Sequence, residues 1–289
     1  MHVLHSLWIY HVRVGEVRTA LDLARRSETI AASLADPDAS AMAEWMLGIA
    51  LHFSGEHCSA RQYLEHLLRS LPPSLRDREI RRAGFDQHTA ARYILARVLW
   101  LQGYADEAVE AVRISLEDAR RMEQPQTLCS VLAWGVCAFA LLVGDLDEAW
   151  RSADELIHEA EKHAFADHLS YGLAALEIIS LRKAGSKAGA EQVRTALERW
   201  RASKGHVMLS VGDFAEAVAA GGLIEETSAM LDEALRQAER NQEFWAYPEM
   251  LRIKGELLLV HENPEFGEAR HTSCVRSNGR APKARWLGS

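Results

Sequence analysis

Gly103-Tyr-Ala-Asp-Glu-Ala108 is repeated almost unchanged as Gly144-Asp-Leu-Asp-Glu-Ala149. Reduced to Gly-x-x-x-x-Ala, the same pattern also occurs at Gly15/Ala20, at Gly55/Ala60 and at Gly185/Ala190. The five copies follow one another at spacings of 40, 48, 41 and 41 residues. A self-similar period of this size is typical of a solenoid or another repeat array. The sequence therefore predicts a fold built by stacking similar units rather than by packing around one centre.

Each glycine is expected to form the turn of a helical hairpin. Glycine suits a short turn because it adopts positive φ without a clash at Cβ, and the small alanine five residues later lets two helices pack closely. Acidic residues open the second helix, where they meet the positive end of the helix dipole. Apolar residues recur at helical spacing on both sides of the turn. Around the third glycine they are Tyr93, Ala96, Leu99, Trp100, Ala108, Val112 and Leu116.

Such hairpins extend over nearly the whole chain. Breaks rich in Pro and Gly separate them at residues 36–38, 71–73, 124–125 and 203–205. A sixth hairpin turns at Gly221-Gly222, where Thr227 replaces the alanine, and a seventh first helix is expected from about Trp245 to Val260. No segment shows the period-two alternation of a strand. The expected fold class is therefore all-α, an α-solenoid of about six to seven helical hairpins over residues 1–264.

Composition narrows the functional classes. Hydrophobic residues make up 48% of the chain and charged residues 26%, which is ordinary for a soluble protein. The longest apolar run is far short of ~20 residues and the N-terminus has no secretory pattern, so neither a membrane span nor a signal peptide is expected. The four cysteines form no CxxC pair, which favours a reduced, cytoplasmic setting. A net charge of −8 argues against direct nucleic-acid binding by this chain.

The last part of the chain differs in composition from the rest. Residues 265–289 form an irregular basic tail, rich in Arg, Gly and Ser and without a helical face, which predicts disorder. With permitted synonymous codons, residues 276–289 can be encoded by DNA that reads, one frame over, as a helical peptide, so a frameshift product is one interpretation of the tail. A natural disordered tail and a basic arm that contacts phosphate are the alternatives. Met1 leads directly into an apolar helix without a polar capping repeat, so the chain is interpreted as a piece of a longer protein.

The hairpins resemble tetratricopeptide repeats. With Gly48 and Gly55 set as the two glycines of that repeat, Ala60 and Pro72 fall on its small-residue and proline positions. The period in this chain is longer than the roughly 34 residues of that family. The resemblance implies a right-handed superhelix whose concave face is lined by the first helix of each hairpin.

Three segments resemble, more specifically, the C-terminal repeat region of large bacterial regulators. They are residues 83–103 (AGFDQHTAARYILARVLWLQG), 144–149 (GDLDEA) and 249–259 (EMLRIKGELLL). Those regulators carry an N-terminal winged-helix DNA-binding domain, or sometimes a nucleotide-cyclase domain, followed by a signal-transduction ATPase and then the repeats. The phosphate-binding pattern Gly-x-x-x-x-Gly-Lys-Ser/Thr does not occur in this sequence, so nucleotide binding is not carried over. No basic recognition helix is evident either, so DNA binding is not carried over.

The expected function is that of a non-catalytic scaffold. Stacked helical repeats usually present a binding surface rather than a catalytic pocket. The resemblance implies the sensor region of a larger signalling or transcription regulator, with a protein, a peptide or a small effector as partner. An accessory region of a nucleotide-cyclase-type protein and a truncated gene fragment without independent function are the alternatives. No catalytic residue, metal or cofactor is assigned.

An aromatic series is the first candidate binding surface. When the first helices are aligned by their turn glycines, Trp45, Tyr93 and Trp134 occupy equivalent positions, which face the concave groove in tetratricopeptide repeats. Aromatic residues and Arg carry much of the energy at binding hot spots. Packing between repeats is the alternative role for these rings. The residues expected near the three aromatics are Ile49, His52, Arg97 and Trp100.

A basic patch is the second candidate. Arg76, Arg78, Arg81 and Arg82 lie between the second and third hairpins, where the spacing of 48 residues indicates an insertion. Inserted loops on solenoids often lie at the binding face, so an anion or an acidic partner segment is a candidate ligand. The interleaved acids Asp77 and Glu79 favour the alternative of a solvated helix.

Histidines and cysteines are weaker candidates. Zinc ligands on one helix favour positions four residues apart, whereas His158, His163 and His168 are spaced by five, so a metal site is not expected. Cys129 and Cys137 are too far apart along a helix to form a disulfide and are interpreted as packed thiols.

Overall fold

The computed structural model describes residues 2–70, 76, 80, 86–185, 191, 193, 195, 211–220 and 222–262. Within these ranges the secondary structure is helical throughout, without a strand. The first helices of the hairpins are α1 (His2–Arg13), α3 (Pro37–Phe53), α6 (Gln87–Leu101), the continuous run of α8 (Pro125–Ser130), η1 (Val131–Cys137) and α9 (Ala138–Val143), α11 (Ala166–Ala184), α13 (Val211–Ala220) and α15 (Tyr247–Glu262). The second helices are α2 (Val17–Leu34), α4 (His57–Ser70), α7 (Ala105–Arg121), α10 (Leu146–Lys162) and α14 (Ile224–Asn241). The all-α hairpin array is confirmed.

The turns have the predicted geometry. Gly103 has φ of 88°, and the turn glycines of the other hairpins also have positive φ, between 54° and 85°. The alanine that follows, Ala108 in this hairpin, has no exposed surface, and the same holds for Ala20, Ala60 and Ala149. In the fourth hairpin the side chain of Asp145 accepts a hydrogen bond from the backbone N–H of Glu148 at 3.0 Å and so caps α10. The motif therefore specifies both the turn and the close contact of its two helices.

One boundary between hairpins was not predicted. The breaks at Asp36-Pro37 and Gln124-Pro125 lie where expected, whereas those at 71–73 and 203–205 fall outside the described residues. Helix α10 ends at a further break, where Ala164 takes a left-handed conformation with φ of 56°. No Gly or Pro marks this turn in the sequence. As a result His158 lies on α10 and His168 on α11, so the three spaced histidines do not share one helix.

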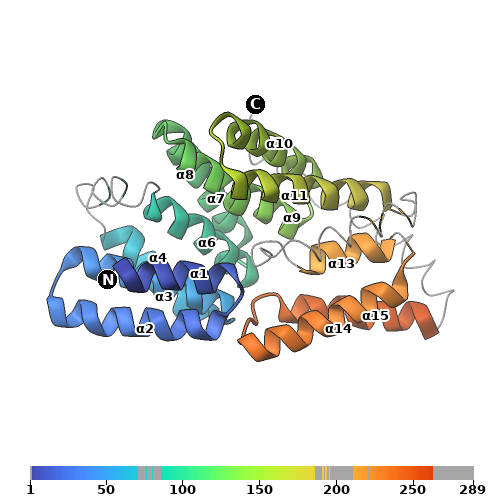
Figure 1. Ribbon diagram of the computed structural model, residues 1–289, viewed down its shortest axis with the longest axis horizontal. Helices are drawn as coiled ribbons and strands as arrows, with labels where there is room; N and C mark the ends of the chain where they lie inside the picture. Colours follow the sequence, from blue (N-terminus) through green and yellow to red (C-terminus); the bar gives the residue numbers. More distant parts are fainter. Residues whose placement is uncertain are drawn as a thin grey trace.

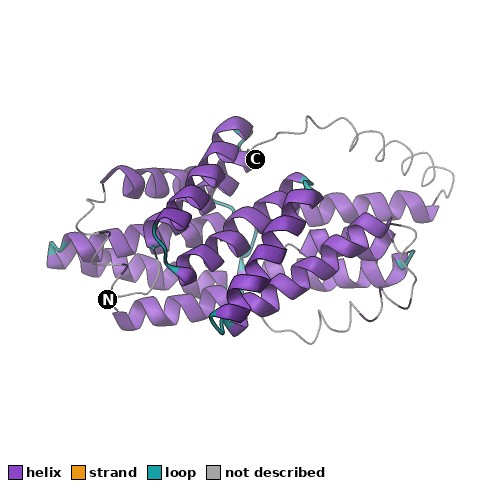
Figure 2. Ribbon diagram, turned by 90° about the horizontal axis from the view of Figure 1, so that it is seen from above, coloured by secondary structure: helices purple, strands orange, loops and turns teal. Residues whose placement is uncertain are grey.

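The helices form two layers. Each first helix contacts the first helix of the next hairpin, from α3 to α6, from α6 to η1 and onward to α15, while each second helix packs on the first helix of its own hairpin (Figure 1). Helices α3 and α6 are buried on nearly every side, whereas α7 buries a single stripe of residues. The first helices thus form an inner layer and the second helices an outer one. Figure 2 shows the packed helices from above.

The array closes on itself. The chain turns back at its C-terminal end so that the corner between α14 and α15 lies on the corner between α3 and α4. There the backbone N–H groups of Phe244 and Trp245 both donate to the carbonyl of Phe53, at 2.9 and 3.2 Å. A second contact across the array is the ion pair of Arg13 on α1 with Asp167 on α11, at 2.7 Å. These two contacts connect hairpins that lie far apart in the chain.

The first helix of the fourth hairpin is unusual in two ways. The stretch Pro125–Val143 is long and apolar enough to cross a membrane by length and composition, which the expectation of no membrane span overlooked, but 72% of it is buried inside the fold. Burial of that kind is typical of the core helix of a soluble protein. Its middle turns, residues 131–137, form a π-helix rather than an α-helix. Such π-turns are rare and occur frequently at functional sites.

The predicted tail, 265–289, lies outside the described residues.

Candidate binding site on the inner face

The seven predicted groove residues lie on three consecutive first helices. None of the seven is fully exposed, and Trp245 of the C-terminal corner lies over Arg97 and beside His52. Buried side chains in the series are Trp45, Ile49 and His52 on α3 and Tyr93 and Arg97 on α6. Half-buried ones are Trp100 on α6 and Trp134 on η1.

Two of the tryptophans pack between helices. The ring of Trp45 lies against that of Trp8 on α1, with centroids 4.9 Å apart. The ring of Trp100 meets Phe139 of α9 edge-on at 5.7 Å. Such offset and edge-to-face contacts are favourable for aromatic pairs in a core. These two rings match the packing alternative stated for the aromatic series.

Arg97 is the unusual residue of this series. Its side chain is 1% exposed, and its Nη2 atom donates a hydrogen bond of 2.7 Å to the backbone carbonyl of Trp134. The Nη1 atom has no hydrogen-bond partner, and no ion pair to Arg97 is formed within the described ranges. Burial lowers the pKa of this guanidinium below its ordinary value. An unpaired charge in the interior costs several kcal/mol, so natural folds rarely keep one without a reason.

The π-helix brings the Trp134 carbonyl to Arg97. Gly135 lies so close to α6 that an added Cβ would come within 3.1 Å of the Cβ of Tyr93. The absent side chain therefore lets the backbones of η1 and α6 approach. This approach places the Trp134 carbonyl within reach of the guanidinium. Gly135 was the only sequence signal for this arrangement, and it lies one residue from a predicted site residue.

Further polar groups around Arg97 also lack partners. The hydroxyl of Tyr171 on α11 and both ring nitrogens of His52 on α3 are buried and form no hydrogen bond within the described ranges. Burial raises the pKa of Tyr171 well above its ordinary value, although the charge of Arg97 lowers it. Burial, with Arg97 and His57 adding to the effect, lowers the pKa of His52 well below 6.5, so that imidazole is neutral.

Asp213 on α13 is the acidic residue that acts on the pKa of Arg97, but its carboxylate already forms an ion pair with another residue. Arg182 of α11 donates to it at 2.7 Å and also pairs with Glu216 at 3.2 Å. Burial raises the pKa of Asp213 to about 6, and Arg182 acts in the opposite direction. Asp213 thus offsets the charge of Arg97 only from a distance.

Trp245 covers these groups. Its ring centroid lies 5.8 Å from the Arg97 guanidinium carbon and 5.6 Å from the ring of His52. Its indole N–H donates to the Glu243 carboxylate at 3.1 Å, and burial raises the pKa of Glu243 to about 7. We refer to His52, Arg97, Tyr171 and Trp245 as the inner cluster. Sequence reasoning identified the first two as site residues and missed Tyr171 and Trp245. Trp245 comes from a hairpin far along the chain, and only the closed array brings it onto Arg97 and His52.

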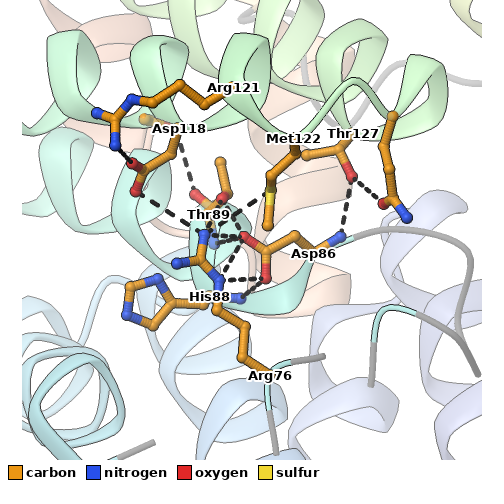
Figure 3. A network of polar contacts seen from close by, with 10 residues as sticks. Arg76, Asp86, His88, Thr89, Asp118, Arg121, Met122 and Thr127 are labelled. Carbon is orange, nitrogen blue, oxygen red and sulfur yellow. Dashed lines mark hydrogen bonds and ion pairs between the residues drawn. The ribbon is translucent and has the colours of Figure 1, made fainter. Parts of the chain in front are cut away.

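The basic patch is represented in the structure by Arg76 alone, since Arg78, Arg81 and Arg82 lie outside the described residues. Figure 3 shows Arg76 in a network around Asp86, the N-cap of α6. Its guanidinium donates to the Asp86 carboxylate at 2.6 Å and lies 3.8 Å from Asp118. The same carboxylate accepts from the backbone N–H and the hydroxyl of Thr89.

Asp86 is deeply buried, and its partners decide its charge. Burial by itself would raise its pKa, but the bonds from Arg76 and Thr89 hold the pKa below the ordinary value. Its backbone N–H donates to the hydroxyl of Thr127 at 3.0 Å, which ties the start of α6 to α8. Arg76 therefore neutralises an internal carboxylate, and its charge is largely committed within the fold.

The remaining candidates stay without an assigned role. No group of three or more His, Cys, Asp or Glu that would suit a metal ion occurs in the described part of the chain. Cys129 and Cys137 are buried free thiols, and burial raises the pKa of Cys137 to about 12. Such thiols behave as packed apolar groups.

Comparison with known proteins relates the fold, but not the sequence, to a known structure. No protein-family model matches this chain, and no curated protein is similar to it in sequence. Among solved structures, that of a Rap protein complexed with competence and sporulation factor is similar, with a TM-score of 0.56, 12% identity and coverage of 88% of this chain and 75% of the other. A likeness at this identity shows the fold alone. The chain is thus a tetratricopeptide-like helical repeat protein by fold.

Proposed function

We propose that this chain is a non-catalytic scaffold that binds a peptide, a protein segment or a small effector on its inner face. The observation that carries the proposal is the set of polar groups on Arg97, Tyr171 and His52 that form no hydrogen bond within the part of the chain that the structure describes. Buried polar groups in native proteins nearly always have a hydrogen-bond partner. Three unsatisfied residues on one face therefore favour a bound molecule that supplies the missing partners.

The similar solved structure supports a scaffold role. The Rap protein in it is complexed with competence and sporulation factor. A repeat array of comparable shape thus accommodates a partner. Because the chain has a net charge of −8, it would repel the phosphate backbone, so nucleic acid is an unfavourable ligand for this chain by itself.

We further propose that the chain works as the sensor region of a larger signalling or transcription regulator in the cytoplasm. The support is the resemblance of residues 83–103, 144–149 and 249–259 to the repeats of such regulators. In that setting, ligand binding to the inner face would change the arrangement of the repeats, and the solenoid would transmit this change to the regulator's other domains. A conformational signal of this kind requires that the ligand prefer one arrangement of the repeats over another.

The test is a binding screen with two matched variants. The full chain is screened by thermal unfolding against a panel of short peptides and small organic effectors, because a ligand at ~100 times its Kd stabilises the folded state by about 2.7 kcal/mol. Hits are then titrated against Trp134→Ala, on the inner face, and Trp150→Ala, on the outer helix α10. We expect Trp134→Ala to weaken binding with unchanged far-UV circular dichroism, and Trp150→Ala to leave binding intact.

Two results would count against the proposal. Hits that bind both variants as tightly as the parent chain place the ligand elsewhere. A loss of helicity in Trp134→Ala would instead assign that ring a packing role, as already seen for Trp45 and Trp100.

A further inference from the structure

We infer that the exposed face of α1 is a docking surface for an acidic amphipathic helix of a partner protein. The face consists of Val3, Leu7 and Tyr10, which we call the N-terminal stripe. This inference goes beyond the proposed function, since none of the candidate inner-face residues belongs to the stripe. It follows from the exposure of the three side chains, from the equivalent positions in other hairpins and from the charge of the first hairpin.

The N-terminal stripe is apolar and open to solvent. Val3, Leu7 and Tyr10 are 74%, 45% and 59% exposed, whereas Trp8 and Val12 on the opposite side of α1 are buried. Spacings of four and three residues place the three exposed side chains on one face of the helix. Helix α1 lies at the start of the array and packs on α2 and α3 with its other side (Figure 1). Single exposed apolar residues are ordinary, but a contiguous group of them is typical of an interaction site.

The same positions are buried in the next three hairpins. When the first helices are aligned by their turn glycines, the residues equivalent to Val3, Leu7 and Tyr10 are apolar and at most 7% exposed. The pattern ends at α11, where Glu177 and Ser180 occupy two of the three positions. The buried equivalents are Ala43, Leu47 and Ala50 on α3, Ala91, Leu95 and Val98 on α6, and Leu132, Val136 and Phe139 on η1 and α9.

The buried copies of this face show what kind of element covers it. Each of these first helices packs against the second helix of the preceding hairpin: α3 against α2, α6 against α4 and η1 against α7. At the first of these contacts, Ala31 of α2 forms a small cluster with Ala39 and Ala43 of α3. Second helices such as α7 bury one apolar stripe and are otherwise polar. An amphipathic helix of that type therefore fits the N-terminal stripe.

Charge favours an acidic helix over a second copy of this chain. Helix α1 contains no Asp or Glu, so the positive end of its dipole is not compensated within the helix. The first hairpin, residues 2–34, contains four Arg and three acids, and is thus positive in a chain of net charge −8. Arg13 is paired with Asp167, which leaves the positive charge at the start of α1 and on α2. Two copies joined at their stripes would bring like charges together, whereas an acidic helix complements them.

The experiment uses the full chain and a peptide with the sequence of α7, residues 105–121, held helical by a side-chain lactam. Helix α7 covers the equivalent face in the array and contains five acids and three Arg. Binding is measured by the anisotropy of a fluorophore on the peptide. We expect saturable binding that weakens as salt is added. A peptide in which Gln and Asn replace the five acids is expected to bind about fivefold more weakly.

Leu7→Glu and Tyr10→Glu are the decisive variants. Both side chains are exposed, so both variants are expected to keep the far-UV circular dichroism and the Tm of the parent chain. Each places a carboxylate in the apolar contact, and we expect each to weaken peptide binding more than about tenfold. Leu258→Glu is the matched control, because Leu258 is a 52% exposed apolar residue on α15, at the other end of the array. Peptide binding by this control is expected to remain unchanged.

Three results would overturn the inference. The absence of saturable binding, or equal binding by Leu7→Glu and the parent chain, would exclude a helix on the N-terminal stripe. A loss of binding in Leu258→Glu alone would place the helix on α15. A dimer of the parent chain in sedimentation that Leu7→Glu dissociates would assign the stripe to a second copy. The proposed function is tested separately, by ligand binding to Trp134→Ala, and stands or falls on that result.

Discussion

His168 provides a quantitative test of the closed, buried inner layer. It lies on α11 with 3% of its surface exposed, and its Nε2 atom is 3.2 Å from the hydroxyl of Ser130. Its ring packs on Trp134 with centroids 5.1 Å apart. Burial lowers the pKa of His168 from 6.5 to about 4, while Asp167 acts to raise it and Arg13 to lower it. In the folded protein the His168 ring therefore remains neutral at pH values well below the pH at which it takes up a proton in the unfolded chain.

The direction of the pH effect follows from this difference in proton binding. Above pH 6.5 both states carry a neutral His168, so its contribution to stability is fully present. Between pH 6.5 and about 4, His168 is protonated in the unfolded chain but remains neutral in the folded chain. The contribution of His168 to the free energy of unfolding is therefore lost as the pH falls through this range. The difference from 6.5 to about 4 corresponds to a loss of about 3 kcal/mol, at ~1.4 kcal/mol per pH unit.

The assay compares the parent chain with His168→Phe by urea unfolding at pH 7, 6, 5 and 4.5. Phenylalanine keeps a ring against Trp134 and cannot titrate. Other groups with shifted pKa values, such as Asp213 and Glu243, are common to both proteins and cancel in the difference. We expect the stability of the parent chain relative to the variant to be constant near pH 7 and to fall steadily toward pH 4.5. A difference that does not change with pH would show that His168 is solvated, and would refute the buried inner layer at this position.

Three further substitutions test the local packing by urea unfolding at pH 7. Asp86→Ala leaves the Arg76 guanidinium without its closest partner, and we expect a loss of about 3–5 kcal/mol. Gly48→Ala places a Cβ at 2.6–2.7 Å from two carbons of the buried Leu64, and a loss of roughly 1–3 kcal/mol is expected. Gly103→Ala meets no neighbouring atom but must adopt φ of 88°, so backbone strain alone should cost about 1–2 kcal/mol.

These three substitutions have different controls. An Asp86→Ala variant as stable as the parent chain would show that Arg76 is free to bind an external anion, as the basic-patch hypothesis requires. For Gly48→Ala, an additional Leu64→Val change should recover part of the loss if the clash is the cause. In the third case, Gly103→Asn should cost less than the alanine variant, because Asn tolerates positive φ better.

The repeat architecture was predictable because its determinants are local. A turn glycine with positive φ, an alanine with no exposed surface and a run of apolar residues at helical spacing all act within one hairpin. Where such a signal was missing, prediction failed. The turn at Ala164 carries neither Gly nor Pro, and the π-turns of 131–137 depend on the approach of Gly135 to Tyr93 on a different hairpin.

The candidate site was only partly predictable. His52 and Arg97 were predicted because they lie near Trp45 and Tyr93, two of the aromatics that align between hairpins, and equivalent positions of a repeat are expected to face the same way. Their burial could not be foreseen in the same manner. Part of it comes from Trp245, which lies on a hairpin far along the chain and packs over Arg97 and beside His52.

The sequence by itself determined the helical hairpins and their order along the chain. Only the tertiary structure decided that the array closes, that Trp245 covers Arg97 and that this guanidinium forms no ion pair with any of the described residues. The reason is physical. A hairpin forms from contacts between residues close in the chain, whereas closure depends on the small rotation between successive hairpins. That rotation accumulates over the whole array and is set by side-chain packing at every interface.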